Sequence, residues 1–258
     1  MSPPFEHIRV LLIQARGTAD IERQEQECFL ERCRLRPEQL VTANVVRDRL
    51  HEGLLDGVHA VMIGGAGEFS ATQDYPWMDD LLALCRLLRA RGFPTFGSCW
   101  GHQILARAYG GTVIHDHARA ELGCHPVMLT EAGRRDPLFR TFPPAFRANM
   151  GHHDRVSVLP EGAVELAYSA TQPNQAFRME DLPIYGTQFH SELDARRERE
   201  RLIRYRAYYL NEMPDEAAFQ HVLDSLAETT EVDHLLHDFL TTFVARPENH
   251  PAGPQQPT

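Results

Sequence analysis

The sequence predicts an α/β fold with an open, mostly parallel sheet flanked by helices, an antiparallel strand-rich portion and a C-terminal helical extension. Three observations lead to this prediction. Up to Gly111, short apolar runs alternate with helical patterns, as in strand–helix–strand units. After Gly111, short strand-like runs follow one another with turns between some of them. From Asp194 onward, apolar residues again recur at helical spacing.

The first portion contains the elements of a parallel sheet. Strands are expected at Ile8–Ile13, Leu40–Val46, Val58–Ile63 and Phe93–Gly97. Helices are expected at Asp20–Arg34, Pro76–Arg91 and Gly101–Tyr109. The helix that begins at Pro76 has Gly92 just past its end, which is the usual placement of these two residue types at helix termini. The alternation places helices on both faces of the sheet.

The second portion is expected to form strands at Thr112–Ile114, Pro126–Thr130, Arg155–Leu159, Val164–Ser169, Gln175–Met179 and Ile184–Phe189. We therefore predict a main domain at 1–195, a helical extension at 196–245 that packs on it, and a disordered Pro- and Gln-rich tail at 246–258. A partner-binding or dimerising role is the alternative for the extension. The stretch Arg196–Arg206 alternates with Glu198 and Glu200, which predicts a solvated helix with salt bridges rather than a docking face.

Composition excludes several classes of function. The formal net charge of −10 argues against a nucleic-acid-binding surface and favours a small-molecule substrate or a protein partner. No apolar run approaches the roughly 20 residues of a membrane span. The chain has no lysine, which excludes a Schiff-base lysine and a P-loop lysine. We expect no cofactor.

Cysteine and histidine usage also limits the options. The five cysteines are odd in number and no secretion signal is present, so we expect a reducing, cytoplasmic location and no disulfide framework. Histidines 115, 117, 152 and 153 have no acidic or cysteine companion at a familiar zinc spacing. We therefore expect no metal site.

Cys99 is the strongest candidate for a nucleophile. It lies between a predicted strand and a predicted helix, with Gly97 and Gly101 two residues away on each side. This is the pattern of a nucleophile elbow, in which glycines relieve crowding around a strained backbone. The helix N-terminus would stabilise a thiolate, and the backbone N–H of Trp100 would point to where an oxyanion forms.

The run Gly97-Ser98-Cys99-Trp100-Gly101-His102-Gln103 resembles the G-x-C-x-G-x-Q motif of class I, triad-type glutamine amidotransferases. Gly186-Thr187-Gln188-Phe189-His190-Ser191-Glu192 is similar to G-x-Q-F-H-P-E, and Gly64-Gly65-Ala66-Gly67 is similar to the G-G-P-G oxyanion loop. Two further segments, Glu121–Cys124 and Met150–Asp154, are similar to the E-[IL]-G-W turn and to the M-S-H-x-D segment of the GMP-synthetase-like branch. These blocks occur in family order over residues 8–195, and the resemblance implies a flavodoxin-like sheet.

The resemblance implies a role for each matched residue. His190 would accept the thiol proton and later protonate the departing ammonia, and Glu192 would orient the imidazole as the third member of a triad. In an extended strand, Glu192 would face the same side as His190. The backbone N–H groups of Gly65 and Trp100 would form the oxyanion hole. Gly64, Gln103, Gly151 and His152 would bind the substrate.

The sequence departs from the family motifs at three positions and leaves the acceptor open. Proline is replaced by Ala66 and by Ser191, and serine is replaced by Gly151, which would matter if the hydroxyl contacts glutamine. Nothing resembling a synthetase module follows Glu192, so the ammonia would go to a separate synthetase subunit. The alternatives are a free-standing hydrolase of γ-glutamyl peptides or amines, and an inactive binding or regulatory subunit.

Overall fold

The computed structural model describes residues 4–210 and 213–245, within which one nine-stranded sheet has the order β2-β1-β3-β4-β11-β10-β9-β6-β7. The parallel part consists of β1 (Val10–Gln14), β2 (Leu40–Asn44), β3 (Ala60–Ile63), β4 (Thr95–Ser98) and β11 (Ile184–Thr187). The antiparallel part consists of β10 (Ala176–Met179), β9 (Ala163–Ser169), β6 (Glu121–Leu129) and β7 (Ala145–His152). β5 (Thr112–His115) and β8 (Asp154–Val158) pair separately. The α/β fold with a mostly parallel core is therefore confirmed.

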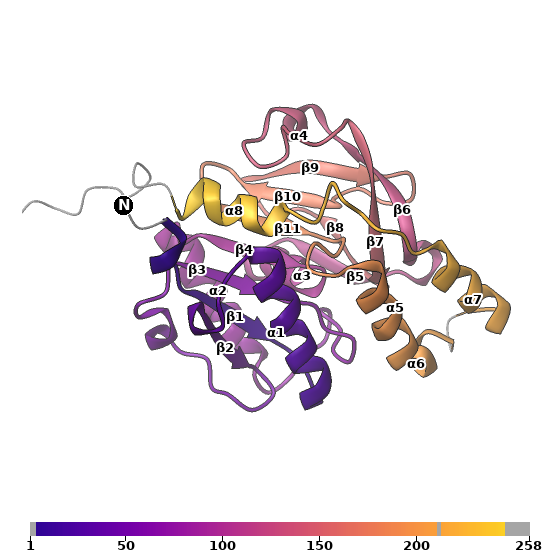
Figure 1. Cartoon of the computed structure of the whole chain (residues 1–258), viewed down its shortest axis with the longest axis horizontal. Coiled ribbons are helices and arrows are strands. Elements are labelled where there is room, and N and C mark those ends of the chain that lie inside the picture. Colours follow the sequence, from indigo (N-terminus) through magenta and orange to yellow (C-terminus); the bar gives the residue numbers. More distant parts are fainter. Residues whose placement is uncertain (1–3, 211–212, 246–258) are drawn as a thin grey trace, which may run out of the picture.

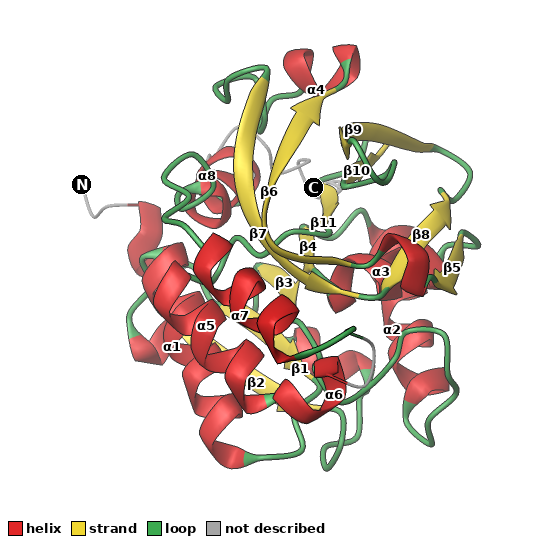
Figure 2. Ribbon diagram, turned by 90° about the vertical axis from the view of Figure 1, so that its right-hand side faces the viewer, coloured by secondary structure: helices red, strands yellow, loops and turns green. Residues whose placement is uncertain are grey.

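Helices cover both faces of the parallel strands (Figures 1 and 2). Alternate residues of β1 enter two different apolar clusters, because successive side chains of a strand point to opposite faces. One cluster receives α1 (Ala19–Cys33) and α8 (Leu235–Phe243), and the other receives α2 (Met78–Arg91) and α3 (Trp100–Ala108). Figure 1 shows the yellow helix α8 near the indigo N-terminal segment, and α8 contacts α1.

The remaining helices are short. α5 (Ala195–Arg204), α6 (Arg206–Leu210) and α7 (Glu216–Ser225) share a small apolar cluster, and α7 contacts β6 while α5 contacts β7. α4 (Glu131–Arg135) follows β6. The chain also forms 3-10 helices, namely η1 (Pro4–His7), η2 (Pro37–Gln39), η3 (Glu52–Leu55) and η4 (His117–Arg119). The helices after residue 195 therefore reach two different parts of the main sheet.

Three boundaries differ from the sequence-based expectations. The segment Glu121–Cys124, expected as a turn, begins the long strand β6, because the left-handed Gly123 (φ 94°) is accommodated inside the β6–β7 ladder beside Ser225. β7 was not predicted as a strand. β11 ends at Thr187, so His190 and Glu192 lie in the segment after the strand rather than on it. The tail predicted for 246–258 lies outside the described residues.

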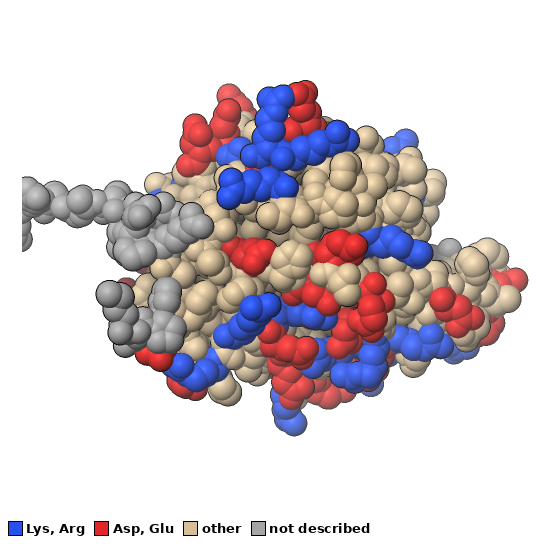
Figure 3. Space-filling view, turned by 45° about the horizontal axis from the view of Figure 1, so that its top comes forward, with Lys and Arg blue, Asp and Glu red and all other residues tan. Residues whose placement is uncertain are grey.

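The surface carries mixed charge. On the face shown in Figure 3, arginine side chains lie next to acidic side chains instead of forming one extended basic patch. Within the described part of the chain, no helix has the length and apolarity that crossing a bilayer requires.

The place of α8 in the core generates a stability prediction. Phe239 is fully buried and its ring lies 5.5 Å from that of Phe96 on β4 and 6.0 Å from that of Tyr185 on β11. Phe239→Ala should therefore lower the free energy of unfolding by about 3–5 kcal/mol in urea denaturation. Val158→Ala, at a side chain that is 58% exposed, should change it by less than about 0.5 kcal/mol. An unchanged midpoint for Phe239→Ala would mean that α8 is not part of the cooperative core.

Candidate active site

Cys99 occupies a strained turn between β4 and α3. Its backbone has φ 50° and ψ −101°, in a region that non-glycine residues seldom adopt, and its residue surface is 5% exposed. Strain of this kind persists only when the surroundings enforce the conformation. The Cys99 N–H donates to the Thr187 carbonyl (2.8 Å), which fastens the turn to the end of the neighbouring strand β11.

The two glycines beside Cys99 are required by close packing. A Cβ atom on Gly97 would lie 2.5 Å from the backbone of Gly101, and one on Gly101 would overlap the Ile63 carbonyl oxygen at the end of β3. Gly101 also donates its N–H to the Gly64 carbonyl (3.1 Å). The start of α3 can therefore approach both β3 and the loop after it only because side chains are absent at these positions.

His190 and Glu192 meet beside Cys99. His190 Nδ1 lies 2.8 Å from Glu192 Oε1, so the imidazole donates this hydrogen bond and turns its other nitrogen outward. The second carboxylate oxygen of Glu192 accepts a hydrogen bond from Ser98 Oγ (2.6 Å). The His190 backbone N–H donates to the Asn149 carbonyl (3.1 Å). Contacts with β7 and with the residue before Cys99 thus fix the orientation of the imidazole.

The charges of this cluster are buried and mutually stabilising. Burial alone raises the pKa of Glu192, but His190, Arg201 and the Ser98 hydroxyl outweigh it and hold the pKa at about 2. Burial alone lowers the pKa of His190, whereas the neighbouring carboxylates and the hydrogen-bonded Cys99 sulfur raise it well above the ordinary value. A carboxylate that favours an imidazolium beside a thiol is the charge arrangement of an activated nucleophile.

The loop after β3 presents glycines to the same point. A Cβ on Gly65 would lie 3.3 Å from the His190 ring, 3.4 Å from the Arg16 guanidinium and 4.0 Å from Cys99 Cβ. A Cβ on Gly64 would lie 2.5 Å from a carboxylate oxygen of Glu25, which pairs with Arg16 in a fully buried ion pair (2.5 Å). Backbone N–H groups near Gly65 and at the start of α3, where Trp100 has no preceding helical turn, therefore surround the space next to the sulfur.

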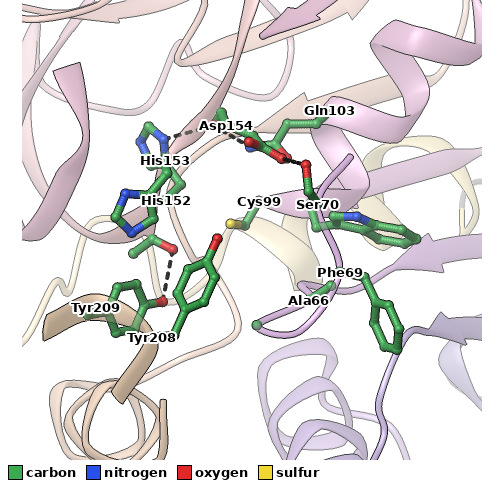
Figure 4. A pocket seen from close by; sticks show the side chains of 13 residues that line it. Ala66, Phe69, Ser70, Cys99, Gln103, His152, His153, Asp154, Tyr208 and Tyr209 are labelled. Atoms are coloured by element: carbon green, nitrogen blue, oxygen red, sulfur yellow. Dashed lines mark hydrogen bonds between the residues drawn. The ribbon is translucent and has the colours of Figure 1, made fainter. Parts of the chain in front are cut away.

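A pocket on one side of the sulfur is lined by Gln103, Gly151 and His152 together with Tyr208 and Tyr209 (Figure 4). The Gln103 amide nitrogen donates to the Asp154 carbonyl (2.6 Å) and to Gln188 Oε1 (3.0 Å), which leaves its carbonyl oxygen to accept a bond from a ligand. The His152 ring is held between Glu121 Oε2 (3.3 Å) and the Asp154 carbonyl (3.1 Å). The structure thus brings the sequence-predicted residues to one pocket beside Cys99.

Sequence reasoning missed the contribution of α5 and α6. The stretch predicted as a solvated helix buries Glu198 (2% exposed) and Arg201 (5% exposed) beside the Cys99 pocket. Tyr209 of α6 lies with its hydroxyl 3.4 Å from the Gly151 carbonyl. The only sequence signal is that residues 198, 201, 202 and 205 fall on one face at helical spacing, and the surrounding run of charged residues obscured it.

Histidines gather on the far side of this pocket. His115 Nδ1 lies 2.6 Å from Asp154 Oδ1, and its Nε2 lies 2.9 Å from His117 Nε2. Asp154 Oδ2 accepts hydrogen bonds from Ser70 Oγ (2.6 Å) and the Ala71 N–H (2.9 Å). Among residues 4–210 and 213–245, no group of three or more His, Cys, Asp or Glu side chains is arranged to hold a metal ion. These contacts fasten the loop after β3 to β8.

Comparisons with known proteins agree with this geometry. The family model described as "Glutamine amidotransferase class-I" matches residues 36–208. A stretch of 100 residues (39% of this chain) is 38% identical to one subunit of the glutamine-hydrolyzing GMP synthase of Pyrococcus abyssi and covers 51% of that protein. A stretch of 134 residues (52% of this chain) is 33% identical to the glutamine-hydrolyzing GMP synthase of Thermosipho africanus and covers 24% of it. The matched stretches therefore span about a quarter to a half of these curated relatives.

Solved structures share the fold over nearly the whole chain. A glutamine amidotransferase from Methylobacillus flagellatus superposes with a TM-score of 0.72 at 22% identity, covering 96% of this chain and 99% of its own. A glutamine amidotransferase from Thermotoga maritima superposes with a TM-score of 0.70 at 23% identity, covering 92% and 97%. At these identities the likeness establishes the architecture, including the C-terminal helices within the aligned length.

The low pKa of Glu192 generates a pH prediction. Since its folded-state pKa of about 2 lies below the ordinary 4.5, ionised Glu192 adds stability that is complete above about pH 4.5 and is lost as the pH falls toward 2. Glu192→Gln removes this dependence, so the stability difference between wild type and variant should shrink by about 3 kcal/mol over that range. Urea unfolding at several pH values measures it. The exposed Glu131→Gln serves as the control, and a constant difference would contradict the assigned charge.

Proposed function

The chain belongs to the class I glutamine amidotransferase family, and on that premise we propose that it hydrolyses the side-chain amide of glutamine through a covalent intermediate on Cys99. The observation that carries this proposal is the alignment of the strained Cys99 with His190, whose Nδ1 is held 2.8 Å from Glu192. A nucleophile, a base and a group that orients the base are the parts required for acyl transfer.

Acylation begins when the Cys99 sulfur attacks the γ-carbonyl carbon, with the thiol proton on His190. The carbonyl electrons move to oxygen, and the N–H groups of Gly65 and Trp100 stabilise the oxyanion. His190 then gives its proton to the amide nitrogen. The C–N bond breaks with its electron pair on nitrogen, ammonia leaves, and a γ-glutamyl thioester remains on Cys99.

Deacylation reverses these roles with water. His190 removes a proton from a water molecule that attacks the thioester carbonyl, and the same two N–H groups stabilise the second oxyanion. The carbon–sulfur bond breaks, glutamate is released, and the proton returns to the sulfur. Throughout, Glu192 holds the imidazole and favours its charged form, while Gln103, Gly151 and His152 bind the amino-acid end of glutamine.

We further propose that the ammonia serves a separate synthetase protein. The Pyrococcus abyssi relative is named as one lettered subunit of a glutamine-hydrolyzing GMP synthase, which is a name for part of a larger enzyme. The acidic chain presents a mixed-charge surface to such a partner. Hydrolysis would then be coupled to the acceptor reaction of the partner.

The nucleophile is tested with Cys99→Ala. Glutamate release from L-glutamine should fall at least about a thousandfold, because removal of one member of a catalytic triad abolishes most of its contribution. Cys124→Ala, a substitution at another buried cysteine, should retain near wild-type release. Undiminished release by Cys99→Ala would refute the mechanism.

The partner is tested by affinity capture from the native cell, followed by a glutaminase assay of the tagged chain with and without the captured protein. Coupling to a synthetase predicts that the partner and its activated acceptor raise glutamate release at least about tenfold, a shift of about 1.4 kcal/mol in the barrier. Equal rates with and without the partner would favour a free-standing hydrolase.

A further inference from the structure

Cys99 separates two compartments of the site. The first, described above, is lined by Gln103 and His152. The second lies on the other side and is the compartment that His190 lines; Glu198, Arg201 and Tyr205 form its outer wall. It holds about 20 Å³, close to the space that a single water molecule needs. The two compartments therefore differ in both polarity and size.

Glu198 in α5 supplies an unsatisfied acceptor to the second compartment. The residue is 2% exposed, and its Oε2 has no hydrogen-bond partner among the described residues. Its Oε1 lies 3.0 Å from where a Cβ of Gly151 would stand. A serine at position 151, as in the family motif, would require Glu198 to shift. The glycine at this position thus makes room for a carboxylate beside the nucleophile.

The positive charges around this compartment are already matched. Arg16 pairs with Glu25. Arg201 lies 3.9 Å from Glu25 and 3.8 Å from Glu192, and its Nε donates to Gln24 Oε1. Buried polar atoms without partners cost free energy, and such atoms persist where a ligand satisfies them. Glu198 Oε2 is therefore available to a small hydrogen-bond donor.

We propose that the second compartment is the site of the departing nitrogen, where Glu198 accepts a hydrogen bond from ammonia and restricts the enzyme to unsubstituted amides. This inference rests on the proposed glutamine hydrolysis. His190 must protonate the leaving nitrogen, so that nitrogen lies on the His190 side of Cys99, while the amino-acid end occupies the first compartment. As the C–N bond breaks, the nitrogen keeps the electron pair and the proton from His190, and its N–H groups face Glu198.

The size of the compartment adds the specificity. A γ-glutamyl peptide or alkylamide carries its substituent on the nitrogen that enters this space. Tyr205, packed against Gly67 of the loop after β3, closes the outer side. A substituent as small as a methyl group would have to displace Tyr205 or Glu198. The structure therefore favours glutamine itself over the γ-glutamyl amine alternative.

The test compares kcat/KM for three substrates: L-glutamine, γ-N-methyl-L-glutamine and glutaric acid monoamide, which lacks the α-amino group. Wild type should prefer glutamine to the methyl amide by roughly 100-fold or more. Glu198→Ala enlarges the compartment and removes the acceptor, so it should slow glutamine hydrolysis and narrow this ratio to below roughly tenfold. Glu198→Gln keeps the volume and an acceptor oxygen and should preserve the ratio.

Controls separate the possible failures. Glu216→Ala, at an exposed carboxylate paired with Arg206, should change no ratio. The preference for glutamine over the monoamide should be unaffected by Glu198→Ala; loss of that preference would assign Glu198 to the α-ammonium group and overturn the proposal. Wild-type hydrolysis of the methyl amide within tenfold of glutamine would also overturn it. Release that survives Cys99→Ala would instead refute the proposed function.

Discussion

The backbone of Cys99, held at φ 50° and ψ −101°, is the constraint on which the rest of the site depends. A conformation of this kind costs about 1–3 kcal/mol and must be enforced by its surroundings. The enforcing contacts are the Cys99 N–H bond to β11, the Gly101 N–H bond to Gly64, and the close approach of Gly97 to the start of α3. These contacts bring three parallel strand ends and two loops to one sulfur atom.

Burying the charges around that atom requires the C-terminal helices. Glu192 and Glu198 both lie within reach of His190, and an uncompensated carboxylate in this environment would be strongly destabilising. Arg201 of α5 supplies a positive charge near Glu192, and Tyr209 of α6 closes the pocket at Gly151. The proposed boundary at residue 195 thus separates segments that contribute side chains to the same site.

The sequence predicted the parallel strands and the elbow because their signals are local. Apolar runs followed by glycines mark β3 and β4, and the Gly-x-Cys-x-Gly spacing marks the strained turn. It did not predict β7 or the start of β6, since alternating exposure and a left-handed glycine resemble loop signals. Glu198 and Arg201 were missed for another reason: their burial depends on where α5 packs, which is a tertiary property, and charged residues at helical spacing normally face solvent.

The covalent intermediate is the most direct test of the central claim. The protein is mixed with L-glutamine, quenched in acid during turnover, and digested for mass spectrometry. The account predicts that the peptide containing Cys99 carries one added γ-glutamyl group, that the adduct is absent in Cys99→Ala, and that no other cysteine peptide is modified. Glutamate release without any adduct on Cys99, or an adduct on a different residue, would contradict the account.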